Sequence, residues 1–137
     1  MRVEEIMTQP VVTVAMDDSL RLIREIFSKM KFHHLLVTEH DKLVGVISDR
    51  DLLKQISPSL DTSAATLQDL AVLDRPAHQI MSRNLVTLRR DASIKMALQA
   101  FLNKEVSCLP IVDHENRIEG IISWKDVFKS LLSLSNT

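Results

Sequence analysis

The amino-acid sequence contains the same pattern twice, and this internal repeat constrains the fold more than any other feature. Residues 6–8 (Ile-Met-Thr) recur as residues 80–82 (Ile-Met-Ser), 74 positions later. Residues 45–48 (Gly-Val-Ile-Ser) recur as residues 120–123 (Gly-Ile-Ile-Ser), now 75 positions later, because a polar turn of the second copy is one residue longer. Loops tolerate such insertions. A copy of about 50 residues buries little surface alone, so we expect the copies to pack on each other.

Each copy predicts the order strand, helix, strand, strand, helix. In the first copy, Ser19 is expected to cap a helix, and its apolar face is predicted at Leu20, Ile23, Phe27 and Met30. Ser93 is the matching cap, followed by Ile94, Ala97 and Phe101. Short apolar runs on either side of a polar turn predict a hairpin in each copy. The predicted strands are residues 11–14, 34–38 and 43–48, then 108–112 and 118–123, and the closing helices are residues 49–56 and 125–134.

The fold class predicted from this order is α+β, with two β-α-β-β-α repeats. The first repeat is assigned to residues 1–56 and the second to residues 77–137. Residues 57–76 are predicted to be a linker, because Ser, Pro, Asp and Thr dominate its first part. Leucines at helical spacing predict a short helix at residues 66–73. Another is expected to begin at Pro76, since proline is favoured at the first helical position.

Composition excludes several classes of function. The chain of 137 residues has only two glycines, Gly45 and Gly120, so no glycine-rich phosphate loop can form. A single cysteine, Cys108, excludes an internal disulfide and a multi-cysteine zinc site, and the spacing of the five histidines predicts no metal site. A net charge of -1 and few aromatic residues argue against nucleic acid as a partner. The acidic start and the lack of a long apolar run predict a cytoplasmic protein that does not contact membranes.

The most specific local motif is Ser-x-x-Asp, present as Ser48 with Asp51 and as Ser123 with Asp126. Each copy is expected to end a strand and open a helix. One interpretation is a capping box, with Asp in place of the usual Glu or Gln. The other is a ligand site, in which helix N–H groups bind a phosphate and the carboxylate accepts both hydroxyls of a ribose. Both copies also carry a basic residue before the aspartate, which capping does not require and which favours the ligand site.

With these motifs in order, the chain resembles a tandem pair of cystathionine β-synthase (CBS) domains, also called a Bateman module. The resemblance covers nearly the whole chain apart from the linker and the tail. The linker and residues 75–81 are further similar to stand-alone CBS pairs of the acetoin-utilisation type. One departure is Leu36, where the family usually has proline, as at Pro110. The matching segments are residues 6–14, 34–37 and 43–52, then 80–88, 109–113 and 118–127.

The resemblance implies two clefts between the repeats, related by a pseudo-two-fold axis, that bind adenosine-containing ligands. Val12 and Val86 would meet the base edge, and Ile121 and Val46 would pack on its face. A partly charged His33 would contact phosphate in a pH-dependent way. The first implied cleft consists of Thr8, Val12, Phe32, His33, Ile121, Ser123, Lys125 and Asp126. The second consists of Ser82, Val86, Val106, Ser107, Val46, Ser48, Arg50 and Asp51.

The function expected from these residues is regulatory rather than enzymatic. AMP, ADP, ATP, S-adenosylmethionine or an NAD-type ligand would act as regulatory ligand, with no catalytic residue and no required cofactor. Binding would change the arrangement of the repeats, and a regulated protein or a second copy in a homodimer would respond. The alternative is a ligand-free interaction or dimerisation module whose Ser-x-x-Asp motifs only cap helices. A phosphate-ester hydrolase is disfavoured, because no nucleophile or general base accompanies the motif.

Two further residues have simple interpretations. Cys108 lies in a predicted strand and is interpreted as a small buried hydrophobic residue. Trp124 either packs on the start of the last helix or faces the base, and the sequence does not separate these positions.

Overall fold

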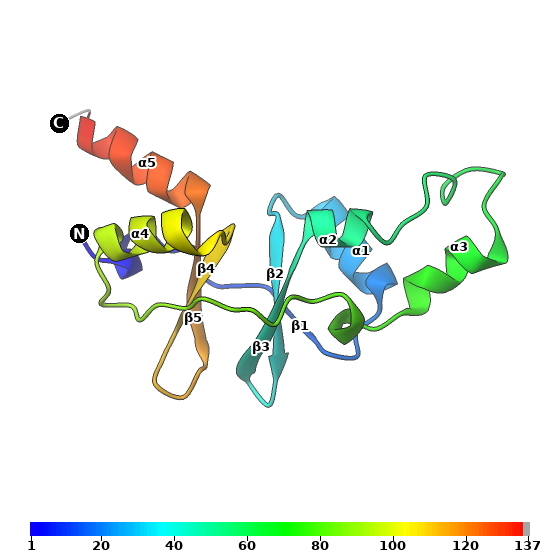
Figure 1. Ribbon diagram of the computed structural model, residues 1–137, viewed down its shortest axis with the longest axis horizontal. Helices are drawn as coiled ribbons and strands as arrows, with labels where there is room; N and C mark the ends of the chain where they lie inside the picture. Colours follow the sequence, from blue (N-terminus) through cyan, green and yellow to red (C-terminus); the bar gives the residue numbers. More distant parts are fainter. Residues whose placement is uncertain (136–137) are drawn as a thin grey trace. The chain divides into compact units, whose positions relative to one another are not determined.

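The computed structural model describes residues 1–135 and divides into two compact units (Figure 1). The repeat-1 unit contains residues 12–40 and 44–83, and the repeat-2 unit contains residues 1–11, 41–43 and 84–135. Neither unit is a continuous stretch of chain. The first eleven residues of the chain belong to the unit built around the second repeat.

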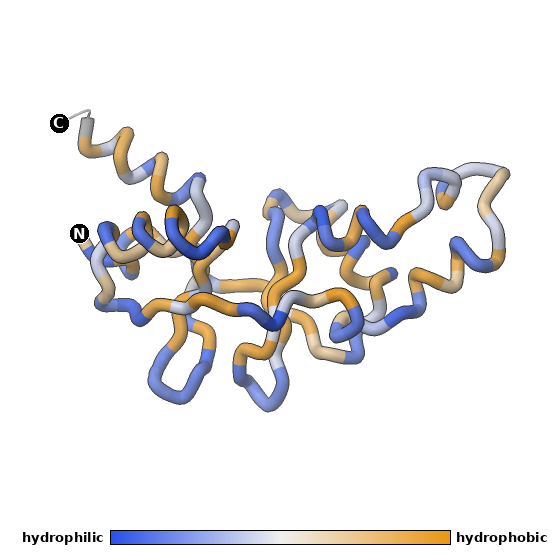
Figure 2. Tube along the Cα trace, in the orientation of Figure 1, coloured by the Kyte–Doolittle hydropathy of each residue, from blue (hydrophilic) through white to orange (hydrophobic). Residues whose placement is uncertain are grey.

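The sheet of the repeat-1 unit has three strands in the order β1 (Thr13–Ala15), β2 (His34–Glu39), β3 (Lys42–Ser48), and the first two residues of β3 are grouped with the repeat-2 unit. β1 runs parallel to β2, with Val14 opposite Val37. His40 and Asp41 join β2 to β3, and both have positive φ angles, 51° and 64°. This is the backbone conformation that two-residue hairpin turns need. The predicted hairpin is therefore confirmed, and Figure 2 shows its turn as a hydrophilic segment.

The helices of the repeat-1 unit begin where the sequence predicts. α1 (Leu20–Lys29) is capped by Ser19, whose Oγ accepts a hydrogen bond from the Leu22 N–H at 3.2 Å. Leu20 and Ile23 are buried, as expected, but Met30 is 47% exposed, so its assignment to the apolar face is wrong. The reason is that the helix ends at Lys29 and Met30 continues in extended conformation.

The other helical segments of this unit differ in detail from the predicted ranges. α2 (Asp49–Leu53) ends three residues before the expected boundary. The linker forms α3 (Leu67–Ala71), continued by a 3-10 turn, Val72–Asp74. Pro76 is the N-cap of the 3-10 turn Ala77–Gln79 rather than its first helical residue.

The repeat-2 unit has the same organisation. β4 (Cys108–Val112) and β5 (Ile118–Ser123) pair antiparallel, over the residues that the sequence predicts. Leu88 forms a parallel bridge to Ile111, which corresponds to Val14 opposite Val37 in the repeat-1 unit. α4 (Ile94–Lys104) is capped by Ser93 through the Met96 N–H at 3.2 Å. α5 (Trp124–Ser135) closes the described part of the chain, and none of the described helices is long and apolar enough to span a bilayer.

The short segment that opens each repeat pairs with the hairpin of the other repeat. Thr8 exchanges two backbone hydrogen bonds with Ile121 on β5, with N···O distances of 2.9 and 3.1 Å. Ser82 makes the matching pair with Val46 on β3, at 2.8 and 3.0 Å. Each unit is therefore completed by a strand-like segment from the other half of the sequence. This exchange places Thr8 and Ser82 beside the strands that lead into the Ser-x-x-Asp motifs.

Each exchanged segment also contributes a methionine to a hydrophobic core. Met81 belongs to the core of the repeat-1 unit and Met7 to that of the repeat-2 unit. A Cβ added to Gly45 would lie within 3 Å of Met81 Sδ and Cγ, and one added to Gly120 would crowd the same atoms of Met7. The two glycines of the chain therefore allow strand packing. Nothing in their surroundings requires close approach of a ligand.

Candidate functional site

In the repeat-1 unit the Ser-x-x-Asp motif is a complete capping box. The Ser48 Oγ accepts a hydrogen bond from the Asp51 N–H at 3.0 Å, and Asp51 Oδ2 accepts one from the Ser48 N–H at 2.9 Å. The strand β3 delivers Ser48, and α2 begins with the next residue. The capping interpretation is thus satisfied here. Asp51 uses only Oδ2 in this box, so the geometry leaves Oδ1 for a further donor.

In the repeat-2 unit the motif has a different geometry, because a third residue reaches its aspartate. Asp126 Oδ2 accepts from the Ser123 N–H at 2.9 Å and from the Ser123 hydroxyl at 3.2 Å. The Thr8 hydroxyl donates to Asp126 Oδ1 at 3.3 Å, although the two residues are 118 positions apart. Three of the predicted site residues therefore meet in one hydrogen-bonded cluster. Ile121 joins them through its backbone bonds to Thr8.

Solvent exposure suits both motifs to ligand recognition. The serine and aspartate of each motif are half-buried, as are Val46 and Ile121 on the strands that lead to them. Arg50 and Lys125, the basic residues before the aspartates, are exposed. A half-buried carboxylate keeps an accessible oxygen while its position is held by backbone donors. An exposed cation beside it adds attraction for an anionic group.

The other predicted site residues are divided between the units. The repeat-1 unit holds Val12, Phe32 and His33, whereas the repeat-2 unit holds Val86, Val106 and Ser107. Each predicted cleft therefore draws residues from both units, and its complete assembly is a prediction.

Phe32 and His33 have partners that the sequence does not reveal. Phe32 packs edge-to-face on Phe27, with ring centroids 6.2 Å apart, so its ring supports the core. His33 Nδ1 lies 2.8 Å from Asp49 Oδ2. Burial lowers the pKa of the neighbouring His34 below its ordinary value of 6.5, and the charge of Asp49 opposes that shift. The role of Asp49 was missed, because Asp at the first helical position has an ordinary explanation in the helix dipole.

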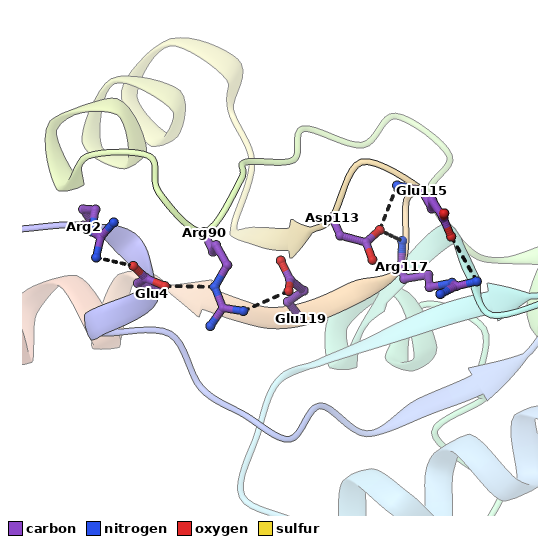
Figure 3. Close-up of polar contacts among 7 residues, drawn as sticks. All are labelled: Arg2, Glu4, Arg90, Asp113, Glu115, Arg117 and Glu119. Atoms are coloured by element: carbon purple, nitrogen blue, oxygen red, sulfur yellow. Dashed lines mark hydrogen bonds and ion pairs between the residues drawn. The ribbon is translucent and has the colours of Figure 1, made fainter.

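A chain of ion pairs in the repeat-2 unit was also missed (Figure 3). Glu4 pairs with Arg2 at 2.7 Å and with the Arg90 Nε at 2.9 Å, and the Arg90 Nη1 pairs with Glu119 at 3.0 Å. The hydrogen bond to Glu4 is the main reason that the pKa of Arg90 is raised. These contacts tie the first residues of the chain to β5. Their partners lie far apart in the sequence, and no local pattern signals them.

Cys108 and Trp124 belong to the core rather than to the site. Cys108 is 6% exposed, and burial raises the pKa of its thiol to about 12, which confirms a small buried residue. Trp124 stacks near Phe101 and Phe128, with ring centroids 4.6 and 5.7 Å away. This favours the packing interpretation of Trp124. Within residues 1–135, no group of three or more His, Cys, Asp or Glu side chains could hold a metal ion.

Two small sheets, each followed by a helix with a Ser-x-x-Asp start, define a paired-repeat module. The model of the CBS domain family matches residues 3–58 and again residues 77–133. The chain therefore belongs to the CBS domain family and carries two copies of the domain.

Curated relatives are longer proteins that contain such a pair. The protein MJ1225 of Methanocaldococcus jannaschii is 30% identical over 128 residues, which cover 89% of this chain and 46% of that protein. A homoserine O-acetyltransferase of Methanohalobium evestigatum is 29% identical over 129 residues, 91% of this chain but 23% of the enzyme. The chain thus spans less than half of the length of these relatives.

Solved structures of similar size share the fold. The CBS pair of protein MJ0100, in complex with 5′-methylthioadenosine and S-adenosyl-L-methionine, has a TM-score of 0.79 and 25% identity, covering 97% of both chains. CBSX2 in complex with AMP has a TM-score of 0.78 and 26% identity, covering 98% of both. The acetoin utilization protein AcuB of Vibrio cholerae has a TM-score of 0.80 and 21% identity, covering 99% of this chain and 93% of that one. This last likeness shows the fold alone.

Proposed function

We propose that this CBS pair is a regulatory module that binds an adenosine-containing ligand and does not catalyse a reaction. The observation that carries the proposal is the cluster at Asp126, where Thr8 joins Ser123 on one carboxylate. A helix cap needs only the serine and the aspartate. A hydroxyl brought from 118 residues away adds a polar group that a cap does not require. The complexes of MJ0100 and CBSX2 support adenosine as the recognised part.

The proposed roles follow the chemistry of each side chain. Asp126 and Asp51 would accept the vicinal hydroxyls of a ribose, because one carboxylate can span both. Lys125 and Arg50 would attract an anionic substituent, and Val46 and Ile121 would pack on the base. We propose one such site for each motif, completed by the residues that the family resemblance assigns from both repeats: Val12, Phe32 and His33 with Thr8, and Val86, Val106 and Ser107 with Ser82.

Signalling would follow from a ligand that contacts residues of both repeats. Such a ligand stabilises the arrangement of the repeats to which it binds best, by its difference in affinity between arrangements. We propose that a regulated partner protein, or a second copy in a homodimer, reads this difference. We also propose a cytoplasmic location, where adenosine ligands are abundant.

Isothermal titration calorimetry with AMP, ADP, ATP, S-adenosylmethionine and NADH tests the proposal. Asp51→Asn and Asp126→Asn are each expected to lower affinity at one site by about tenfold or more, since they remove a charged acceptor. The linker offers a matched control, because Thr66 and Asp69 form the same reciprocal capping box at α3. Asp69→Asn should weaken this capping box, together with the hydrogen bond that the Ser59 hydroxyl donates to Asp69 at 2.8 Å, and should leave ligand binding unchanged.

A ligand-free interaction module is the second candidate, and one observation favours it. The Ser48–Asp51 box has the same bonds as the Thr66–Asp69 box, which has no proposed ligand. If no adenosine compound binds, and Asp51→Asn and Asp69→Asn both lower stability, this second candidate is correct.

A further inference from the structure

The polar turn between β4 and β5, which is one residue longer than its counterpart in the first repeat, contains a residue that bonds to the first hairpin. The carbonyl of Asn116 in this turn accepts a hydrogen bond from the Leu43 N–H, with an N···O distance of 3.0 Å. The Asn116 Nδ2 group donates to the Leu43 carbonyl at 2.8 Å. Both backbone polar groups of Leu43 are therefore bonded to one residue, which lies 73 positions later in the chain.

The longer turn holds Asn116 in the conformation that it has in this contact. Its φ angle is 65°, in the left-handed region, which asparagine tolerates better than most residues. Its N–H donates to the Asp113 carbonyl at 3.0 Å, which fixes its place in the turn. Within residues 1–135, the shorter β2–β3 turn makes no matching pair of bonds to Ile118, the residue of β5 that corresponds to Leu43. The contact therefore belongs to the turn of the second repeat alone.

The strand that receives this contact leads to a Ser-x-x-Asp motif. β3 begins with two residues that are grouped with the repeat-2 unit, and it ends at Ser48, in the repeat-1 unit. Along the strand, Leu43 is bonded to Asn116, Val46 to Ser82, and the Ser48 N–H to the motif's aspartate. Because the backbone bonds of one strand open in contiguous groups, loss of the first of these bonds should loosen the residues that follow it.

We propose that Asn116 is a positioning residue for the proposed ligand site at Ser48 and Asp51, and that it acts through β3. By holding the first half of this strand it restricts the movement of Val46, which the proposed function places on the base, and of Ser48. The inference rests on the proposed function and refines it, since it makes the turn of the second repeat a determinant of affinity at the motif of the first repeat.

The other motif is expected to be independent of this contact. Its strand, β5, is held by the pairing of Ile121 with Thr8 and by the ion pair between Glu119 and Arg90 at 3.0 Å. None of these bonds involves Asn116, so the expected effect of its side chain is selective for one of the two proposed sites.

Asn116→Asp tests the contact in the ligand-free chain. Aspartate tolerates the same φ angle, but it replaces the Nδ2 donor by an acceptor that faces the Leu43 carbonyl. Hydrogen exchange measured by NMR should show about tenfold lower protection at the N–H groups of Leu43, Val46 and Ser48, the usual effect of one lost hydrogen bond. Asn103→Asp makes the same change at an exposed position of α4 and should leave this protection unchanged.

Calorimetry with AMP, and with S-adenosylmethionine in parallel, measures the two sites separately. The Asp126→Asn chain retains the Asp51 site, and there Asn116→Asp should lower the affinity by about threefold or more. In the Asp51→Asn chain, which retains the Asp126 site, the same change should leave the affinity unchanged. A general loss of structure would lower both affinities, so the difference between the two backgrounds is the readout of positioning.

The outcomes separate this inference from the proposed function. Loss of protection confined to Leu43, or an equal loss of affinity at both sites, would overturn the positioning role and leave adenosine binding intact. If no adenosine compound binds the native chain, the proposed function is wrong, and the exchange of the Ser48 N–H decides the rest. Lower protection of Ser48 in Asn116→Asp would then support the action through β3, and unchanged protection would overturn it. Thermal unfolding of each variant checks that it is folded.

Discussion

At the scale of single residues, the two glycines and two methionines form a matched pair of contacts. Met81 lies against Gly45, and Met7 lies against Gly120. Neither glycine has a positive φ angle, so backbone conformation does not require glycine at these positions. A side chain is excluded there by the close approach of the methionine. Gly45→Ala and Gly120→Ala should each lower the free energy of unfolding by about 1–3 kcal/mol, the usual cost of an overpacked core. Urea denaturation measures this cost.

Double variants test whether the methionine side chain causes the loss of stability in the glycine-to-alanine variants. If the Cβ conflicts with the Met7 side chain, Gly120→Ala should destabilise a Met7→Ala background much less than the native chain. Gln99→Ala, at an exposed position of α4, is the neutral control. Equal costs in both backgrounds would show that the strand backbone, rather than Met7, requires glycine.

Cys108 gives a second prediction at this scale, on thiol reactivity. Its pKa of about 12 results from burial, and the thiolate is the reactive species. At pH 8 only about one thiol in 10,000 is ionised if the pKa is four units higher. The folded protein should therefore react very slowly with a disulfide reagent such as DTNB, and the urea-unfolded protein should react at once. Rapid stoichiometric labelling of the folded protein would contradict a buried position.

At the scale of elements, the β4–β5 turn is held by one carboxylate. Asp113 Oδ1 accepts hydrogen bonds from the N–H groups of Arg117 and Glu115, each at 2.9 Å (Figure 3). The backbone bond from Arg117 is the main cause that lowers the pKa of Asp113 below its ordinary value of 3.8. A carboxyl with a lowered folded-state pKa stabilises the fold above pH 3.8. This contribution is lost as the pH falls through the lowered value.

Asp113→Ala should therefore lower the urea midpoint at pH 7, and the difference from the native chain should shrink as the medium becomes more acidic than pH 3.8. Glu115→Ala is the matched control, since within residues 1–135 that side chain forms ion pairs with His114 and Arg117 of the same exposed turn. A loss for Asp113→Ala that is independent of pH would mean that the carboxylate charge is not involved.

Elements were predictable from the sequence where their signals are local. Ser19 and Ser93 cap the helices that they were expected to cap, and the apolar runs gave β4 and β5 their bounds. The ends of α1 and α2 were predicted too late, because no glycine or proline stands at either end to stop the apolar pattern. Met30 is exposed because α1 ends at Lys29, one residue before it.

At the scale of the whole molecule, the pairing of distant segments could not be predicted from periodicity. A pattern of apolar residues predicts a strand but does not name its partner. Thr8 pairs with Ile121, and Glu4 pairs with Arg90, across more than half of the chain. The family resemblance, rather than the local pattern, associated Thr8 with Ser123 and Asp126, and the structure brings these three residues together.

The exchanged first segment leads to the last prediction, that the repeat-2 unit depends on the start of the chain. Val3 and Met7 are buried in the core of this unit, each stabilising it by about 1.5–3 kcal/mol on the usual scale for buried side chains. Removing residues 1–8 should expose this core and release the Ile121 N–H from its bond to the Thr8 carbonyl. Hydrogen exchange should then show loss of protection at β5.

The repeat-1 unit supplies the internal control for this deletion. Its strand β3 is completed by Ser82, which the deletion leaves in place, so the Val46 N–H should stay protected. A synthetic peptide of residues 1–11 added to the truncated chain should restore protection at β5, because it supplies the same core side chains and the same backbone partners. Unchanged protection of Ile121 in the truncated chain would show that β5 is stable without the exchanged segment. Equal loss at Ile121 and Val46 would show instead that the two units unfold together.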